Sequence, residues 1–204
     1  MRLLATEGKR FIECEEKGSG FYDGIYSKER VYSVPACESP NYPIYEKVVK
    51  KISDTERVLD LGCGTGQFAQ VLLNHGKKFV MGVDFSPVAI KKAQSMLPHC
   101  LFKEADLYRS VPYGIVHYEC ATLIEVMEHL EHDLVVLGHI HEGTHVIFTV
   151  PNYITEEGSH VRGFLSEKDI TDRYGKLIEI MGIEEVKMGT TQKLFIVDSI
   201  RRDA

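Results

Sequence analysis

The apolar residues of this chain change from an irregular to a periodic arrangement near residue 56. Before that point aromatic residues are frequent but follow no period, and three prolines interrupt the middle of the stretch. One helix is predicted there, over residues 42–52, with an inner stripe of Ile44, Val48, Val49 and Ile52. We interpret residues 1–55 as an N-terminal lid or arm and residues 56–204 as the main part of the same domain.

From residue 56 onward, short apolar runs alternate with segments of helical period. Strands are predicted at residues 57–61, 79–83, 100–103, 117–124 and 145–150, and helices at 64–75, 86–97, 126–138 and from Ser166 onward. Ser86 with Pro87 is a helix start, and Ser166 with Asp169 is a weaker version of a capping box. This alternation predicts a mostly parallel sheet covered by helices on both faces.

The end of the chain departs from this alternation. Two strands are predicted at residues 184–188 and 194–198, and no helix separates them. Two strands this close in sequence favour a terminal antiparallel hairpin that extends the sheet.

Composition narrows the class of protein. The 204 residues include 44% hydrophobic and 26% charged residues, which is typical of a single globular domain. The net charge of -6 disfavours non-specific binding to nucleic acid, and no apolar run is long enough to cross a bilayer. Five cysteines without a C-x-x-C pair, and an N-terminus without a secretory apolar region, indicate a reducing, cytoplasmic compartment. The oligomeric state is left open.

The most informative segment is VLDLGCGTG at residues 58–66. A buried strand enters a glycine-rich turn, and a helix follows, so that glycines at Gly62, Gly64 and Gly66 allow a ligand to approach the backbone closely. A dinucleotide site would place a third glycine where Gln67 stands, and the Gly-Lys-Ser/Thr ending of a phosphate-binding loop is missing. We interpret Cys63 as a small loop residue.

Three acids lie in, at the end of and just after three successive predicted strands, respectively. Asp60 lies just before the glycine turn, where an acid repels a pyrophosphate but suits an ammonium group. Asp84 ends the next strand and can accept hydrogen bonds from both hydroxyls of a ribose. Asp106 follows the third strand and can accept from the amine of an adenine, whose faces Phe85 and Leu107 would flank. Together the acids predict a ligand with an amino-acid end, a ribose and an adenine.

These motifs resemble those of the class I methyltransferases that use S-adenosylmethionine (SAM). The matching segments are VLDLGCGTG (58–66), GVDFSP (82–87), EADL (104–107), IEVMEHL (124–130) and FTVPN (148–152). The resemblance covers about residues 56–200 and implies a Rossmann-like, seven-stranded, mostly parallel sheet with an antiparallel last strand. We expect SAM to contact the three acids, the residues of the glycine loop and a few residues around them. The full set is Asp60, Gly62, Cys63, Gly64, Gly66, Asp84, Phe85, Asp106, Leu107, Glu125 and Tyr26.

A second candidate site follows the strand at 117–124. In a helix, Glu125, Glu128 and His129 would lie at i, i+3 and i+4 on one face. Two carboxylates and an imidazole can transfer protons, and they can also bind a divalent cation. We therefore predict a catalytic role for all three residues and keep a metal-free polar helix start as the alternative.

The E-x-x-E-H pattern of this segment resembles two groups of methyltransferases. One group methylates ubiquinone precursors. The other methylates the 3′ end of small RNAs and holds a metal with both glutamates, the histidine and a later histidine, which would correspond to His160. The spacing to His160 is shorter than in the RNA enzymes, and their signature is replaced by Ser159-His160-Val161-Arg162-Gly163-Phe164. An H-x-R-x-F segment of this kind is frequent in small-molecule methyltransferases.

Three functions remain open on the sequence alone. The first is O- or N-methylation of a small molecule, which the acidic charge and the H-x-R-x-F segment favour. The second is metal-dependent 2′-O-methylation of RNA 3′ ends. The third is a SAM-binding module without catalysis.

Overall fold

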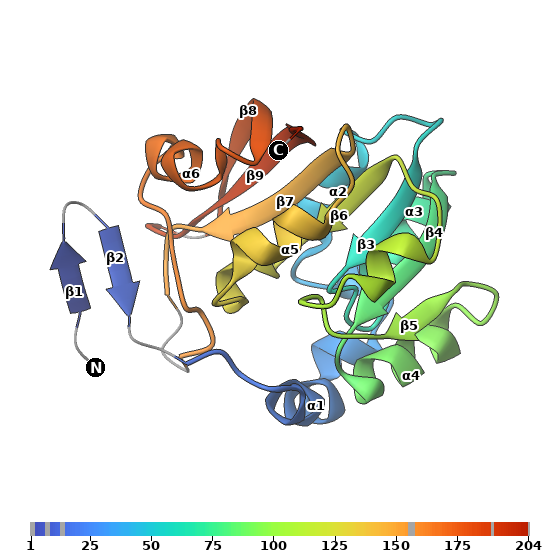
Figure 1. Cartoon of the computed structure of the whole chain (residues 1–204). Helices are drawn as coiled ribbons and strands as arrows, with labels where there is room; N and C mark the ends of the chain where they lie inside the picture. Colours follow the sequence, from blue (N-terminus) through green and yellow to red (C-terminus); the bar gives the residue numbers. More distant parts are fainter. Residues whose placement is uncertain (1–2, 7–8, 13–14, 155–157, 189, 204) are drawn as a thin grey trace. The chain divides into compact units, whose positions relative to one another are not determined.

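The computed structural model describes residues 3–6, 9–12, 15–154, 158–188 and 190–203 (Figure 1). This part of the chain contains a seven-stranded sheet in the order β5-β4-β3-β6-β7-β9-β8. The strands are β3 (Arg57–Leu61), β4 (Lys78–Asp84), β5 (Phe102–Glu104), β6 (Cys120–Leu123), β7 (His145–Pro151), β8 (Ile178–Lys187) and β9 (Lys193–Arg201). The pairs β3–β4, β3–β6 and β4–β5 are parallel, whereas β9 runs antiparallel to both β7 and β8. The predicted Rossmann-like sheet with a terminal antiparallel hairpin is confirmed.

Six α-helices occur in the described ranges: α1 (Ser19–Lys28), α2 (Tyr42–Val49), α3 (Gln67–Asn74), α4 (Pro87–Met96), α5 (Asp133–His139) and α6 (Glu167–Tyr174). Short 3-10 turns are η1 (Arg30–Ser33), η2 (Ala36–Glu38), η3 (Val111–Gly114) and η4 (Met127–His129). The periodicity did not predict α1, nor the small antiparallel pair of β1 (Leu3–Thr6) and β2 (Lys9–Ile12).

The chain divides into two compact units, which we describe separately. One unit comprises residues 18–122, with α1 to α4 and the strands β3 to β5. Its glycine loop packs on α3, α4 and β5 through buried Cys63, Ala69, Ile90, Ala93 and Phe102. The other unit comprises residues 1–17 and 123–204, with β7 to β9 and the helices α5 and α6.

Local signals in the sequence predicted several boundaries correctly. The strand at 57–61 matches β3, and the predicted inner stripe of α2 is buried. The Ser86 side chain accepts a hydrogen bond from the amide of Ala89 at 3.1 Å, which caps α4 as expected. Ser166 and Asp169 form a complete capping box at the start of α6.

Other boundaries differ from the prediction. The helix expected over 64–75 begins only at Gln67, because the three glycines before it adopt positive φ. The strand expected at 100–103 lies at 102–104, and the strand expected at 117–124 is shortened to Cys120–Leu123. Both strands of the terminal hairpin are longer than predicted.

The helix predicted over residues 126–138 is confirmed only for its second half, which is α5, whereas its first half is not α-helical. The chain forms the short turn η4 and then α5, with His132 as the residue preceding α5. The guanidinium of Arg162 donates hydrogen bonds to the carbonyls of Met127 (2.9 Å), Leu130 and Glu131 (2.9 Å). Carbonyls of a continuous helix would bond along their own backbone, so this distant arginine replaces the helix with a turn. The common helical face predicted for Glu125, Glu128 and His129 therefore does not form.

Strand β8 forms one edge of the sheet (Figure 1). Its pairing with β9 shifts register between Ile180 and Gly182, which leaves Met181 in a bulge. Exposed charges follow along the strand at Glu179, Glu185 and Lys187. Among the helices that the structure describes, none combines the length and the apolar character needed to span a membrane.

Candidate functional site

The glycine loop between β3 and α3 is held against the end of β4. Gly62, Gly64 and Gly66 have φ values of 75°, 51° and 82°, a region that residues with a side chain rarely adopt. The amides of Gly62 and Cys63 both donate to the carbonyl of Val83, at 2.7 and 2.9 Å. The loop is thus a fixed left-handed turn with its backbone open to close approach.

Asp84 links β4 to the glycine loop. One carboxylate oxygen accepts from the amide of Gly64 at 2.9 Å, and the other accepts from the amide of Ser86 at 2.9 Å. Burial raises the pKa of Asp84 to about 6, although these backbone donors favour the charged form. Each oxygen keeps a lone pair, so the carboxylate can still accept hydrogen bonds from a ligand.

Asp60 lies at the end of β3 and is almost completely buried, with 2% of its surface exposed. The hydroxyl of Thr122 donates to one carboxylate oxygen at 2.7 Å, whereas the other oxygen has no hydrogen-bond partner in the described part of the chain. Burial raises the pKa of Asp60 to about 7, with a smaller opposing effect of Thr122. A buried carboxylate with one unsatisfied oxygen suits a cationic ligand group.

Hydrogen bonds link α1, and the residues that follow it, to the start and the side of α4. Asp23 accepts a hydrogen bond from the Ser86 hydroxyl, and the ammonium of Lys92 donates to the carbonyl of Tyr26 and to the Ser33 hydroxyl. Tyr26 consequently lies over the glycine loop: a Cβ atom at Gly64 would be 3.3 Å from its phenolic oxygen. Burial, and secondarily the charge of Asp84, raise the pKa of Tyr26.

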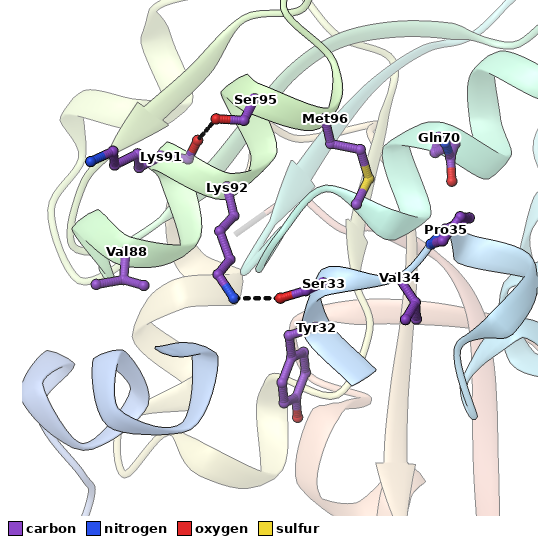
Figure 2. Close-up of a pocket in the computed structure, with 10 residues that line it drawn as sticks. All are labelled: Tyr32, Ser33, Val34, Pro35, Gln70, Val88, Lys91, Lys92, Ser95 and Met96. Atoms are coloured by element: carbon purple, nitrogen blue, oxygen red, sulfur yellow. Dashed lines mark hydrogen bonds between the residues drawn. The ribbon is translucent and has the colours of Figure 1, made fainter. Parts of the chain in front are cut away.

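An open pocket of about 660 Å³ lies beside this attachment (Figure 2). Residues 32–35, Gln70 and five side chains of α4 line it, and the ammonium of Lys92 reaches Ser33 within it. None of the residues predicted to bind SAM is among those that line the pocket. The pocket lies between α4, Gln70 of α3 and residues 32–35, and it is distinct from the predicted cofactor residues.

The remaining predicted cofactor residues differ in exposure. Cys63 and Leu107 are buried, and burial raises the pKa of the Cys63 thiol, which disfavours the nucleophilic thiolate form. The ring of Phe85 lies 5.4 Å from that of Tyr22. Asp106 has a half-exposed side chain that accepts from the amide of Tyr108 at 2.8 Å.

In the other unit, Glu128, His129 and His160 converge although the predicted helix is absent. Their ligand atoms all lie within 4.8 Å of one another, and the two histidine rings are 4.9 Å apart. The Nδ1 atom of His129 lies 2.8 Å from the carbonyl of Ser159, and its Nε2 atom lies 3.8 Å from Glu128. With a proton on Nδ1 donated to this carbonyl, a neutral His129 presents Nε2 as an acceptor.

Glu128 is fully buried, and neither of its carboxylate oxygens has a hydrogen-bond partner among the residues described. Burial raises its pKa above the usual range for glutamate, and burial together with Glu128 does the same for Glu125. Burial lowers the pKa of His129. The cluster therefore consists of neutral or proton-sharing groups at neutral pH unless a cation is present.

Glu125 is not part of this three-residue convergence and is held separately. It has a φ of 57°, and its amide donates to the hydroxyl of Thr149 at 2.7 Å. The same hydroxyl donates to a carboxylate oxygen of Glu125 at 3.3 Å.

A buried ion-pair network sets the position of the turn that carries Glu128 and His129. Asp133 forms an ion pair with Arg162 at 3.0 Å and accepts hydrogen bonds from Arg173 at 2.8 Å and from the hydroxyl of Tyr174 at 2.7 Å. Because Arg162 also binds three carbonyls of residues 127–131, the network joins η4, α5 and α6.

Several of these positioning residues were missed from the sequence: Thr122, Thr149, Arg162, Asp23 and Lys92. A threonine inside an otherwise apolar strand was the one available signal for Thr122 and Thr149. The partners of the charged residues lie 30 or more positions away in most cases, and no local pattern reveals them.

Comparison with known proteins identifies the class. A methyltransferase domain family matches residues 15–178, more than half of the chain, and the chain therefore belongs to this family of class I SAM-dependent methyltransferases. Trans-aconitate 2-methyltransferase of Escherichia coli is 40% identical over 57 residues, 28% of this chain and 23% of that protein. The corresponding enzyme of Yersinia pseudotuberculosis is 33% identical over 85 residues, 38% of this chain and 31% of that protein. The matched stretch thus spans less than a third of the length of either relative.

A solved structure supports the same fold. Magnesium protoporphyrin IX methyltransferase of Synechocystis, solved with bound SAM, superimposes with a TM-score of 0.65 at 16% identity. The superposition covers 93% of this chain and all of that protein (100%).

The raised pKa of Asp60 predicts a pH-dependent stability. Its folded value of about 7 exceeds the ordinary 3.8, so the folded protein retains a proton that the unfolded chain releases. The stabilisation is complete below about pH 4 and is lost as the pH rises through 7. Chemical denaturation of the SAM-free protein should show this decline, and it should be shallower in Asp60→Asn. Equal slopes for both proteins would contradict the assignment of the decline to Asp60.

Proposed function

We propose that the protein transfers the methyl group of SAM to a small molecule. The observation that carries the proposal is Asp60, a buried carboxylate behind the glycine turn with one unsatisfied oxygen. This oxygen suits the ammonium group of the methionine part of SAM. A small-molecule acceptor is supported by the relative trans-aconitate 2-methyltransferase and by the structurally similar magnesium protoporphyrin IX methyltransferase, both named for small-molecule substrates.

In this proposal Asp84 accepts hydrogen bonds from the ribose hydroxyls. The glycines at Gly62, Gly64 and Gly66 allow the cofactor to lie against the backbone. Phe85 and Leu107 flank the adenine, and Asp106 accepts a hydrogen bond from the adenine amine. Cys63, Tyr26 and Glu125 complete the contacts as smaller contributors. The sulfonium of SAM is already activated, so that the protein has to align the acceptor and remove a proton from it.

The cluster of Glu128 and His129 is the proposed source of the base. With Nδ1 of His129 bound to the Ser159 carbonyl, Nε2 can take a proton from an acceptor hydroxyl or amine. The burial that lowers the pKa of His129 keeps it in the neutral form that accepts a proton. Glu128, with an oxygen 3.8 Å from Nε2, would then stabilise the histidinium that forms, and Glu125, whose pKa is raised in part by Glu128, is the proposed second acid of the site.

A divalent metal is the second candidate for this cluster, and the grouping of Glu128, His129 and His160 favours it. Carboxylate and imidazole atoms within 4.8 Å of one another fit an ion of this kind, which would supply Lewis acidity toward an acceptor oxygen. Glu125, also expected as a ligand, lies outside the convergent group. Metal-dependent RNA methylation rests on this cluster alone, and the net charge of -6 stands against it.

We also propose that residues 1–55 act as a lid over the cofactor and that the protein works in the cytoplasm. The contact of Tyr26 with the glycine loop supports the lid. Hydrogen exchange across residues 18–45 should slow when SAM is added, because the segment would close on the ligand. Identical exchange with and without SAM would reject the lid and leave a fixed arm.

Calorimetry with SAM tests the cofactor assignment. Asp84→Ala should weaken SAM binding by roughly 1.5–3 kcal/mol, because buried hydrogen bonds to a charged group are lost. Asp172→Ala, at an exposed position on α6, is the matched control and should bind normally. Wild-type affinity in the Asp84 variant would remove the basis of the proposal.

Turnover of a small-molecule pool with labelled SAM tests the base. His129→Ala should abolish or sharply reduce methyl transfer while SAM affinity stays within about twofold, since the residue is not expected at the cofactor. Activity lost to a chelator and restored by Mg, Mn or Co would establish the metal alternative, and indifference to chelation would establish the metal-free base. A protein that binds SAM but methylates neither metabolites nor RNA would be a binding module.

A further inference from the structure

We propose that Thr149 is a positioning residue that fixes Glu125 for methyl transfer, an inference that rests on the proposed function. Its hydroxyl makes two hydrogen bonds to the same glutamate. It accepts from the Glu125 amide at 2.7 Å and donates to a Glu125 carboxylate oxygen at 3.3 Å. One hydroxyl thereby fixes both the backbone and the side chain of Glu125.

The backbone of Glu125 requires such support. Its φ is 57°, and among the described residues other than glycine it alone has a positive φ. Left-handed conformations are unfavourable for residues with a side chain and persist where neighbouring groups over-determine them. Glu125 stands two residues after the end of β6, and the Thr149 hydroxyl is the group that holds its amide.

Thr149 is placed where packing alone would select a valine. It lies in the middle of β7, has no exposed surface, and its neighbours Phe148 and Val150 are also fully buried. A buried hydroxyl is costly unless it is hydrogen-bonded. Because the one proton of this hydroxyl and one of its lone pairs go to Glu125, the polar group serves that residue.

A second buried threonine does the same for the predicted cofactor acid. Thr122 has no exposed surface, and its hydroxyl donates to Asp60 at 2.7 Å. Each compact unit therefore contains one interior strand threonine that orients one candidate site acid. The two residues form a matched pair that separates an effect on cofactor binding from an effect on transfer.

The test uses the full-length protein with the variants Thr149→Val, Thr149→Ser and Thr122→Val. Valine preserves the shape of threonine and removes the hydroxyl, whereas serine preserves the hydroxyl. The acceptor probe is a deproteinised small-molecule extract with labelled SAM, and SAM affinity is measured by calorimetry. Hydrogen exchange at the Glu125 amide is measured by NMR in the absence of any ligand.

Thr149→Val should lower the transfer rate by roughly tenfold, the size expected for the loss of one or two buried hydrogen bonds, and should change SAM affinity much less, because Glu125 is only a smaller contributor to the proposed cofactor contacts. Thr149→Ser should restore most of the rate. Thr122→Val should instead weaken SAM binding several-fold. The Glu125 amide should exchange faster in Thr149→Val than in Thr149→Ser.

Two results would overturn the proposal. Wild-type transfer by Thr149→Val would show that the hydroxyl is not needed, and equal losses in the valine and serine variants would show that Thr149 acts through packing. If the wild-type protein itself transfers no methyl group, the proposed function fails. The exchange rate of the Glu125 amide then still decides whether Thr149 holds that residue.

Discussion

A carboxylate that leaves water must be compensated, and this constraint organises the structure. Asp60, Asp84, Glu128 and Asp133 are each at most 4% exposed. Asp133 is compensated by the chain itself, through two arginines and a tyrosine. Asp60 keeps one unsatisfied oxygen and Glu128 keeps two. The chain thus satisfies Asp133 and leaves Asp60 and Glu128 for a ligand, a shared proton or an ion to complete.

The ion pair between Asp133 and Arg162 also determines where Glu128 lies. Arg162 binds Asp133 and, with the same guanidinium, the carbonyls that would have continued a helix beyond η4. The turn that results brings Glu128 and His129 toward His160, which is separated from Arg162 by one residue. A single buried cation therefore links the stability of this unit to the shape of its candidate site.

Features with local causes were predictable from the sequence. The glycine turn, the Ser86 cap and the Ser166–Asp169 box depend on residues within a few positions of one another, and all three form as expected. The first half of the helix expected over 126–138 was mispredicted, because the residue that competes for its carbonyls, Arg162, lies more than 30 positions away from Leu130. His160 was included among the predicted metal ligands because of the resemblance to the RNA methyltransferases. The structure places it beside Glu128 and His129 through tertiary contacts. The hydrogen-bonding roles of Thr122 and Thr149 could not be predicted, because a threonine fits the pattern of a strand equally well whether or not its hydroxyl has a partner.

The bulged and charged edge of the sheet has a consequence for assembly. An exposed edge strand offers unpaired backbone groups to another chain, and a flat, apolar edge invites addition of a further strand. In β8 the bulge at Met181 interrupts the regular spacing of these groups, and Glu179, Glu185 and Lys187 would bring charges against an incoming strand. This edge of the sheet is consequently a poor template for the strand of a second copy.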